Sequence, residues 1–328
     1  MSGGLDRHLG IHGDGKVEVP SVLMQDHDFL ASLLLQGDTA NGVRFELISD
    51  IRTLNLANPS VVAAELSFAR HLMRLAKTDH SWVAIPAFVQ RGFTHRHWYV
   101  RKDSSYWDFR DLAGKRVGIS EWGATGNTWS RAAARDGGLD VPDVEWVVGA
   151  VEDGGYINRL DQLPDNASYF DGASLADALH RGTIDALVSP DPPLPFYEEA
   201  APTRRLLSDY QSAERDFFER TGVLPGHHVV GVKRELYERR PDILAAIFDD
   251  LARAKDEFAR LRLADGDTSP WLVSDLEEAM RLMGPDWRPF GTERNEAMIA
   301  YLCRDMSSQG LLLSEVVPSR VFEEFDSV

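Results

Sequence analysis

The residues best suited to bind an anion lie in a polar turn at positions 120–128. Two glycines in the turn let the backbone approach a ligand closely, and Ser120, Thr125 and Asn127 add hydrogen-bonding side chains. A short β-type run precedes the turn and an Ala-rich helical stretch follows it, so the N–H groups of a helix N-terminus lie at the end of a strand. We therefore predict a carboxylate or phosphate site here, and the alternative is an ordinary strand-to-helix connection. The spacing matches neither nucleotide-binding loop, which disfavours nucleotides as ligands.

A cationic segment follows a continuous apolar run at residues 82–89. Arg91 could bind a carboxylate through two parallel hydrogen bonds, or it could be an ordinary surface arginine. His95 is a candidate for proton transfer, because an unperturbed histidine titrates near neutral pH; the alternative is a structural histidine. His95 and His97 would share one face of a strand, but no helical zinc motif accompanies them, so we expect no metal site.

A second pair of histidines, His227 and His228, begins another β-type run. Neighbouring residues of a strand point to opposite faces, so only one of the two should face a ligand, and His228 is the other proton-transfer candidate. Glu121 could accept a phenol proton, or it could be a structural carboxylate at the turn. Asp26 could contact the ligand, or it could begin the following helix.

Strands and helices alternate along the chain, which predicts an α/β protein with mostly parallel sheets. The expected strands lie at 17–24, 43–48, 82–89, 98–100, 116–119, 144–148, 184–188 and 227–232. Between Asn58 and Lys77 we predict a helix, because Val62, Leu66 and Ala69 fall on one helical face.

The composition excludes several classes of partner. The 328 residues carry a net charge of −17, which argues against nucleic-acid backbones and anionic membrane surfaces. A single cysteine, Cys303, excludes an intrachain disulfide and a cysteine-based zinc site. No stretch is apolar enough to span a membrane, and the N-terminal residues lack the pattern of a signal peptide, so we expect a cytoplasmic protein.

Several segments together resemble the 4,5-dihydroxyphthalate decarboxylase family, which is similar in turn to type 2 periplasmic solute-binding proteins. They are KRVGISEWGATGNTW, SWVAIPAFVQRGFTH, GTIDALVS and HHVVGVKRELYERRP, with DHD at 26–28 and MGPDWRPFG at 283–291. The resemblance covers roughly residues 17–328. The chain departs from the family pattern at Gly123, Arg96 and His227, so its substrate could differ from that of the family.

The resemblance implies a two-lobed fold of the periplasmic-binding-protein type, with the ligand in a cleft between the lobes. Residues 17–108 and 228–328 would form lobe one and residues 109–227 lobe two, after a flexible lead-in over residues 1–16. The family pattern also favours His228 over His227 as the residue that faces the ligand.

The function implied is decarboxylation of a dihydroxylated aromatic acid without a cofactor, which gives CO2 and a catechol-type acid similar to protocatechuate. His95, His228 and Glu121 would be catalytic, and Arg91, Ser120, Thr125, Asn127 and Asp26 would bind the substrate. The only partner expected is a small aromatic carboxylate, and the sequence leaves a homo-oligomer open. The alternative is a solute-binding or ligand-sensing protein, because one fold can host both functions.

Overall fold

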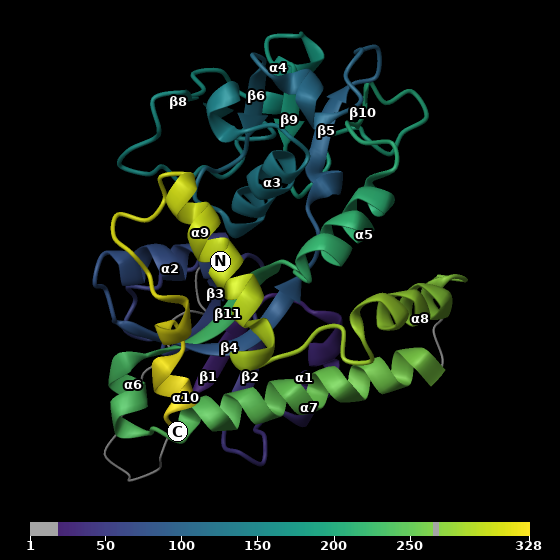
Figure 1. The fold of residues 1–328 in the computed structure, drawn as a ribbon. Helices are drawn as coiled ribbons and strands as arrows, with labels where there is room; N and C mark the ends of the chain where they lie inside the picture. Colours follow the sequence, from purple (N-terminus) through teal and green to yellow (C-terminus); the bar gives the residue numbers. More distant parts are fainter. Residues whose placement is uncertain (1–18, 265–268) are drawn as a thin grey trace, which may run out of the picture. The chain divides into compact units, whose positions relative to one another are not determined.

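The computed structural model describes residues 19–264 and 269–328, and it divides into two compact units (Figure 1). Of the described residues, the first unit comprises 19–90, 228–264, 269–296 and 317–328. The second unit comprises Arg91–His227 and Ala297–Val316. The predicted lead-in over residues 1–16 lies outside the described residues.

The units differ from the predicted lobes in two places. The chain enters the second unit at Arg91, well before the predicted position 109, because β5 (Trp98–Arg101) pairs with β9 (Ala186–Val188) in the second sheet. Most of α9 (Glu296–Ser308) also belongs to the second unit. The second unit is therefore built from two separate stretches of the chain.

The first unit is built on a five-stranded sheet with the strand order β2-β1-β3-β11-β4. β1 pairs in parallel with β2 and β3, and β11 runs antiparallel to β3. The carboxyl ends of β1 and β3 therefore meet the beginning of β11 at one edge of the sheet. The strands are β1 (Ser21–Met24), β2 (Arg44–Leu47), β3 (Ala63–Ser67), β4 (Trp82–Arg91) and β11 (Gly226–Lys233).

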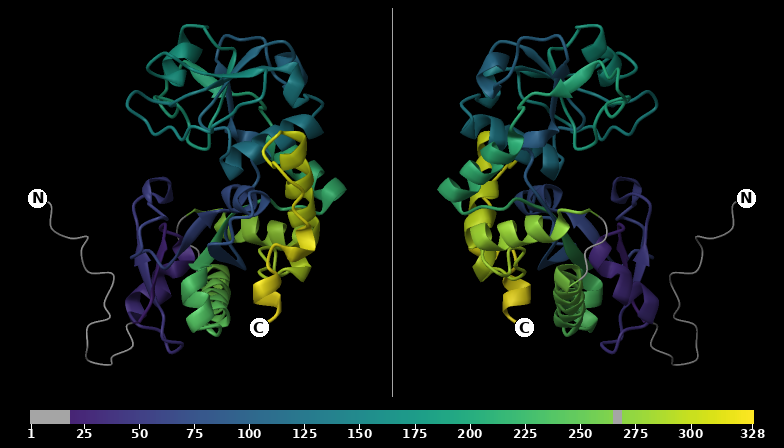
Figure 2. Two further views of the ribbon diagram at one scale, coloured as in Figure 1. Left: turned by 90° about the vertical axis from the view of Figure 1, so that its left-hand side faces the viewer. Right: turned by 90° about the vertical axis from the view of Figure 1, so that its right-hand side faces the viewer.

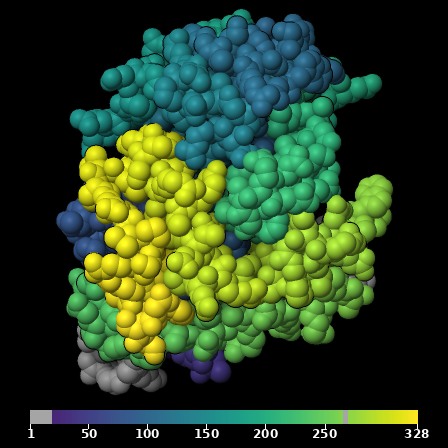
Figure 3. Space-filling view, in the orientation of Figure 1, coloured from purple at the N-terminus to yellow at the C-terminus, as the bar shows by residue number. Residues whose placement is uncertain are grey.

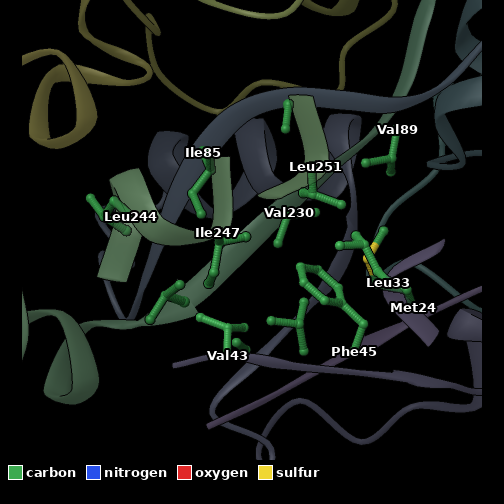
Figure 4. Packing of buried hydrophobic residues seen from close by; sticks show 14 of the residues in the cluster. Met24, Leu33, Val43, Phe45, Ile85, Val89, Val230, Leu244, Ile247 and Leu251 are labelled. Atoms are coloured by element: carbon green, nitrogen blue, oxygen red, sulfur yellow. The ribbon is translucent and has the colours of Figure 1, made fainter. Parts of the chain in front are cut away.

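The core of the first unit lies between this sheet and the long helix α7 (Ile243–Ala264), which is seen beside the strands in Figure 2. Fully buried side chains of the strands, such as Val230 and Met24, cluster with Ile247 of the helix (Figure 4). Burial of each such side chain contributes about 1.5–3 kcal/mol to folding. This packing fixes the position of the strands that carry the residues at the edge of the sheet.

The other helices of the first unit are short. None of the residues of α8 is fully buried, and Figure 3 shows this helix at the surface in yellow-green. Among the described residues, no helix combines the length and the apolar character needed to cross a membrane. The helices are α1 (Ala31–Gln36), α2 (Phe68–Ala76), α6 (Arg234–Arg239), α8 (Leu272–Met283) and α10 (Glu323–Asp326).

The predicted helix over residues 58–77 is wrong in its first half. Residues 63–67 form β3, an inner strand between β1 and β11, and only Phe68–Ala76 is helical. An inner strand is apolar on both faces, so its residues can also match a helical stripe, and sheet pairing decides between the two. Consequently, Glu65 is a residue of an inner strand.

The second unit contains a six-stranded sheet with the order β10-β5-β9-β6-β7-β8. β6 pairs in parallel with β7 and β9, whereas β5 runs antiparallel to β9 and β10. The remaining strands are β6 (Arg116–Ile119), β7 (Glu145–Val148), β8 (Ala167–Tyr169) and β10 (Thr203–Arg205). The helices, besides α9, are α3 (Thr125–Asp136), α4 (Leu175–His180) and α5 (Tyr210–Thr221).

Candidate active site

The Glu65 side chain binds two histidines within the first unit, and its carboxylate is completely buried. Oε1 accepts a hydrogen bond from Nδ1 of His228 at 2.6 Å, and Oε2 accepts one from Nε2 of His27 at 2.9 Å. The backbone N–H of Gln25 also donates to Oε2, at 2.9 Å. We call His27, Glu65 and His228 the His-Glu-His network.

The strand register explains why these residues meet. Val230 of β11 lies opposite Glu65 of β3, and His228 is two residues before Val230, so His228 and Glu65 share one face of the sheet. Such diagonal neighbours are within reach of long side chains. On the other side of β3, Leu23 of β1 lies beside Ala64, so the chain leaves β1 next to Glu65 and brings His27 to it.

Glu65 is negatively charged at neutral pH. Burial disfavours its charged form, but the hydrogen bonds from His228 and His27 outweigh this effect and lower the pKa of the carboxyl to about 2. An ionised carboxylate can only accept hydrogen bonds, so Nδ1 of His228 and Nε2 of His27 each carry a proton. The opposite nitrogen of each ring remains for proton transfer. The two histidine side chains keep 17% and 13% exposure, whereas that of Glu65 has none.

A hollow of about 470 Å³ lies beside His27. This volume is within the usual range for sites that bind small molecules. It contains Asp26, one of the predicted substrate-binding residues, and most of its lining groups are polar. The lining residues are Gln25, Asp26, His27, Leu47, Ile48, Ser49 and Gln90.

Arg288 lies in the same unit, next to an aromatic ring that packs on the network. Its guanidinium carbon is 6.0 Å from the centre of the Phe29 ring. The Phe29 ring stacks on His27, with 5.7 Å between ring centres and an interplanar angle of 15°. Nη2 of Arg288 donates to the backbone oxygen of Val89 at 3.2 Å. The Phe29 ring therefore lies between the Arg288 cation and His27 of the His-Glu-His network.

The predicted anion-binding turn leads into α3 of the second unit. Nδ2 of Asn127 donates to Oγ of Ser120 at 3.0 Å and to the backbone oxygen of Glu121 at 2.7 Å. Glu121, Thr125 and Asn127 are buried. Asn127 therefore holds the turn in a fixed conformation at the N-terminus of a helix of 12 residues.

His95 and His97 do not lie on a strand, contrary to the prediction. They belong to a 3-10 turn, His95–His97, in which the N–H of His97 donates to the backbone oxygen of Thr94 at 3.0 Å. The chain must turn here to pass from β4 to β5. The His95 ring packs against Phe217, with 5.6 Å between ring centres, and burial lowers its pKa to about 4. His95 is therefore a neutral, buried ring at neutral pH.

Arg91 and His227 bind backbone oxygens of the second unit. Nη2 of Arg91 donates to the oxygen of Leu224 at 2.7 Å, and Nε2 of His227 lies 2.7 Å from the oxygen of Gly92. The rings of His227 and His228 thus have different partners, as expected for neighbours in a strand.

The predicted site residues fall into two groups. Asp26 and His228 belong to the first unit, close to Glu65 and the hollow. The second unit contains the others, which are Arg91, His95, Ser120, Glu121, Thr125 and Asn127.

Three residues around the network were missed by the sequence analysis, although signals existed. His27 and Arg288 lie within DHD and MGPDWRPFG, two of the segments that carry the family resemblance. Glu65 is the one acidic residue in the otherwise apolar run at residues 61–66, and a lone carboxylate in such a run is costly to bury unless it has partners. Within residues 19–264 and 269–328, no group of three or more His, Cys, Asp or Glu side chains is arranged to hold a metal ion.

Comparison with known proteins gives a relative with a named activity. The chain is 30% identical over 268 residues to a 4,5-dihydroxyphthalate decarboxylase of Comamonas testosteroni. The aligned region covers 79% of this chain and 81% of the relative. No family model matches the chain.

Solved structures identify the fold. The alkanesulfonate-binding protein SsuA of Xanthomonas axonopodis pv. citri superposes on this chain with a TM-score of 0.52 at 13% sequence identity. The superposition covers 92% of this chain and 96% of the SsuA chain. The desulfurization enzyme DSZB superposes with a TM-score of 0.50 at 16% sequence identity, over 94% of this chain and 99% of the DSZB chain. The predicted α/β fold of the periplasmic-binding-protein type is thereby confirmed. Binding proteins and an enzyme share it, so the fold does not by itself decide the function.

Proposed function

Because this chain belongs to the 4,5-dihydroxyphthalate decarboxylase family, and is thus a carboxy-lyase, we propose that it removes CO2 from 4,5-dihydroxyphthalate or a very similar dihydroxylated aromatic acid. The observation that carries the proposal is the pair of histidines held by Glu65, one of which, His27, lines a polar hollow. The product of this reaction would be 3,4-dihydroxybenzoate.

The reaction needs one proton donor and one proton acceptor. A phenol para to the leaving carboxylate gives its proton to a base and supplies electrons to the ring. The ring carbon that bears the carboxylate then takes a proton from an acid. The bond to the carboxylate breaks, its electron pair restores the aromatic ring, and CO2 leaves. A positioned acid or base typically contributes about 10²–10⁴-fold to such a step.

We assign these roles to the His-Glu-His network. His228 is the proton donor, through Nε2, and His27 accepts the phenol proton, through Nδ1. Glu65 fixes the protonated nitrogen of each ring and provides the negative charge that stabilises an imidazolium. His95 is the weaker candidate for the donor, because its buried ring is enclosed by aromatic side chains and its pKa of about 4 keeps it neutral. Glu121 remains a candidate for the base.

The polar turn of the second unit is proposed as an anion-binding element in its own right. A helix N-terminus with a fixed turn and the buried Thr125 hydroxyl suits a carboxylate. Ser120 and Asn127 would act by holding the turn, because their side chains bind each other.

Turnover measurements test the assignment. Purified protein is incubated with 4,5-dihydroxyphthalate and related hydroxybenzoates, and CO2 release is followed. His228→Gln should lower kcat by about 10²–10⁴-fold, whereas His80→Gln, at an exposed position of the same unit, should leave kcat unchanged. Full turnover in His228→Gln would refute the role of His228. Tight binding of one acid without any CO2 release would instead favour a solute-binding function.

A further inference from the structure

Arg288 is half-buried, and it uses little of its hydrogen-bonding capacity within the described residues. Its guanidinium carries five N–H donors, and one hydrogen bond, to the backbone oxygen of Val89, is formed with the described residues. No ion pair involves Arg288 within the part of the chain that the structure describes. Burial lowers the pKa of Arg288, and the nearby charge of Asp28 opposes this only in part. The cation is therefore partly desolvated and does not form an ion pair with a carboxylate of the described residues.

The position of this cation relates it to the candidate active site. One face of its environment is the Phe29 ring, which stacks on His27 of the network. Its one backbone partner, Val89, precedes Gln90, which lines the hollow together with Asp26 and His27. The guanidinium is thus separated from the His27 ring by the Phe29 ring.

A carboxylate is the anion that fits such a group. The planar fork of arginine can hold both oxygens of a carboxylate through parallel, charge-assisted hydrogen bonds. A partly desolvated guanidinium binds it more strongly than an exposed one does, because water screens the attraction less.

A diacid substrate offers two carboxylates, and they are not equivalent. The leaving carboxylate loses its charge as CO2 forms, so a strong cation bound to it would stabilise the substrate more than the transition state. The retained carboxylate keeps its charge throughout, so a cation can hold it without opposing the reaction.

We propose that Arg288 binds the carboxylate that remains in the product, and thereby selects aromatic diacids as substrates. This inference rests on the proposed function. Arg288 is then a specificity-determining residue, and the network beside it carries out the proton transfers.

Binding of the product separates this role from a purely structural one. Calorimetry is performed with 3,4-dihydroxybenzoate, which keeps the retained carboxylate, and with catechol, which has none. Arg288→Met should weaken binding of 3,4-dihydroxybenzoate by about 10- to 100-fold and leave catechol binding unchanged. Arg288→Lys should restore part of the loss. Arg294→Met is the matched control, because Arg294 is an exposed arginine of the same segment and pairs with Asp286.

Three results would overturn the inference. Unchanged affinity for 3,4-dihydroxybenzoate in Arg288→Met would show that Arg288 binds no retained carboxylate. Weaker binding of the diacid with unchanged binding of the product would assign Arg288 to the leaving group. Equal losses for 3,4-dihydroxybenzoate and catechol, with a lower melting temperature, would indicate a structural role. A wild-type protein that releases no CO2 from the diacid would refute the proposed function itself, and with it the idea of a retained carboxylate.

Discussion

Replacing Glu65 with glutamine removes one charge and almost no volume. The wild-type carboxylate accepts hydrogen bonds from three donors, which are the Gln25 backbone and the two histidine rings. A glutamine side chain has one oxygen and one NH2 group, so at least one donor would face another donor. A histidine must then change its tautomer or lose its hydrogen bond.

The cost in stability can be worked from the pKa of Glu65. A fall from the ordinary value of 4.5 to about 2 corresponds to about 3 kcal/mol of folding free energy. The folded-state pKa is the lower one, so this stability is present above pH 4.5 and is lost as the pH falls toward 2. We therefore expect Glu65→Gln to be about 3 kcal/mol less stable than the wild type at pH 7, and the difference to shrink below pH 4.5.

Urea unfolding at pH 7, 5 and 3 measures this difference, with Glu238→Gln at an exposed site of α6 as the control. The same variant should lower kcat for CO2 release by about 10²-fold or more, because a positioned acid contributes at least that much. A variant with unchanged stability at pH 7 and unchanged kcat would refute both the structural and the catalytic role of the network.

Three further predictions concern other parts of the chain. If the second-unit turn binds a carboxylate, Thr125→Val should weaken ligand binding by about 10-fold or more in calorimetry; unchanged affinity would exclude this site. His71 is fully buried with no hydrogen-bond partner among the described residues, and burial lowers its pKa to about 4. The folded-state pKa is the lower one, so the wild type loses stability as the pH drops below about 6.5. The His71→Leu variant has no such group, so its free energy of unfolding relative to the wild type should rise by about 2–3 kcal/mol between pH 7 and pH 4.5, as measured by urea unfolding. Gly231→Ala should lower the free energy of unfolding by about 1–3 kcal/mol, because a Cβ there would collide with Leu66 on the neighbouring strand; an unchanged melting curve would contradict that packing.

Local patterns in the sequence were enough to predict much of the fold. The continuous apolar run at residues 82–89 is part of β4, and the run at 116–119 is β6, followed by the polar turn and α3. In these places a continuous run of strand-forming residues marks the strand, so neighbours along the chain determine the structure, although β4 extends two residues beyond the apolar run, to Arg91. The α/β class and the family follow from such segments together.

The His-Glu-His network could not be found in this way. Glu65 and His228 are 163 residues apart in the sequence, and only the pairing of β3 with β11 brings them together. The apolar stripe around Glu65 matches a helix as well as an inner strand, and long-range pairing selects the strand. The sequence by itself determined which residue types could transfer a proton, histidines and carboxylates, but it did not single out His27. The tertiary structure decided which histidines share the buried carboxylate of Glu65. Burial of that charge is costly unless it is hydrogen-bonded, and the pairing of strands from distant segments brings the two histidines to it.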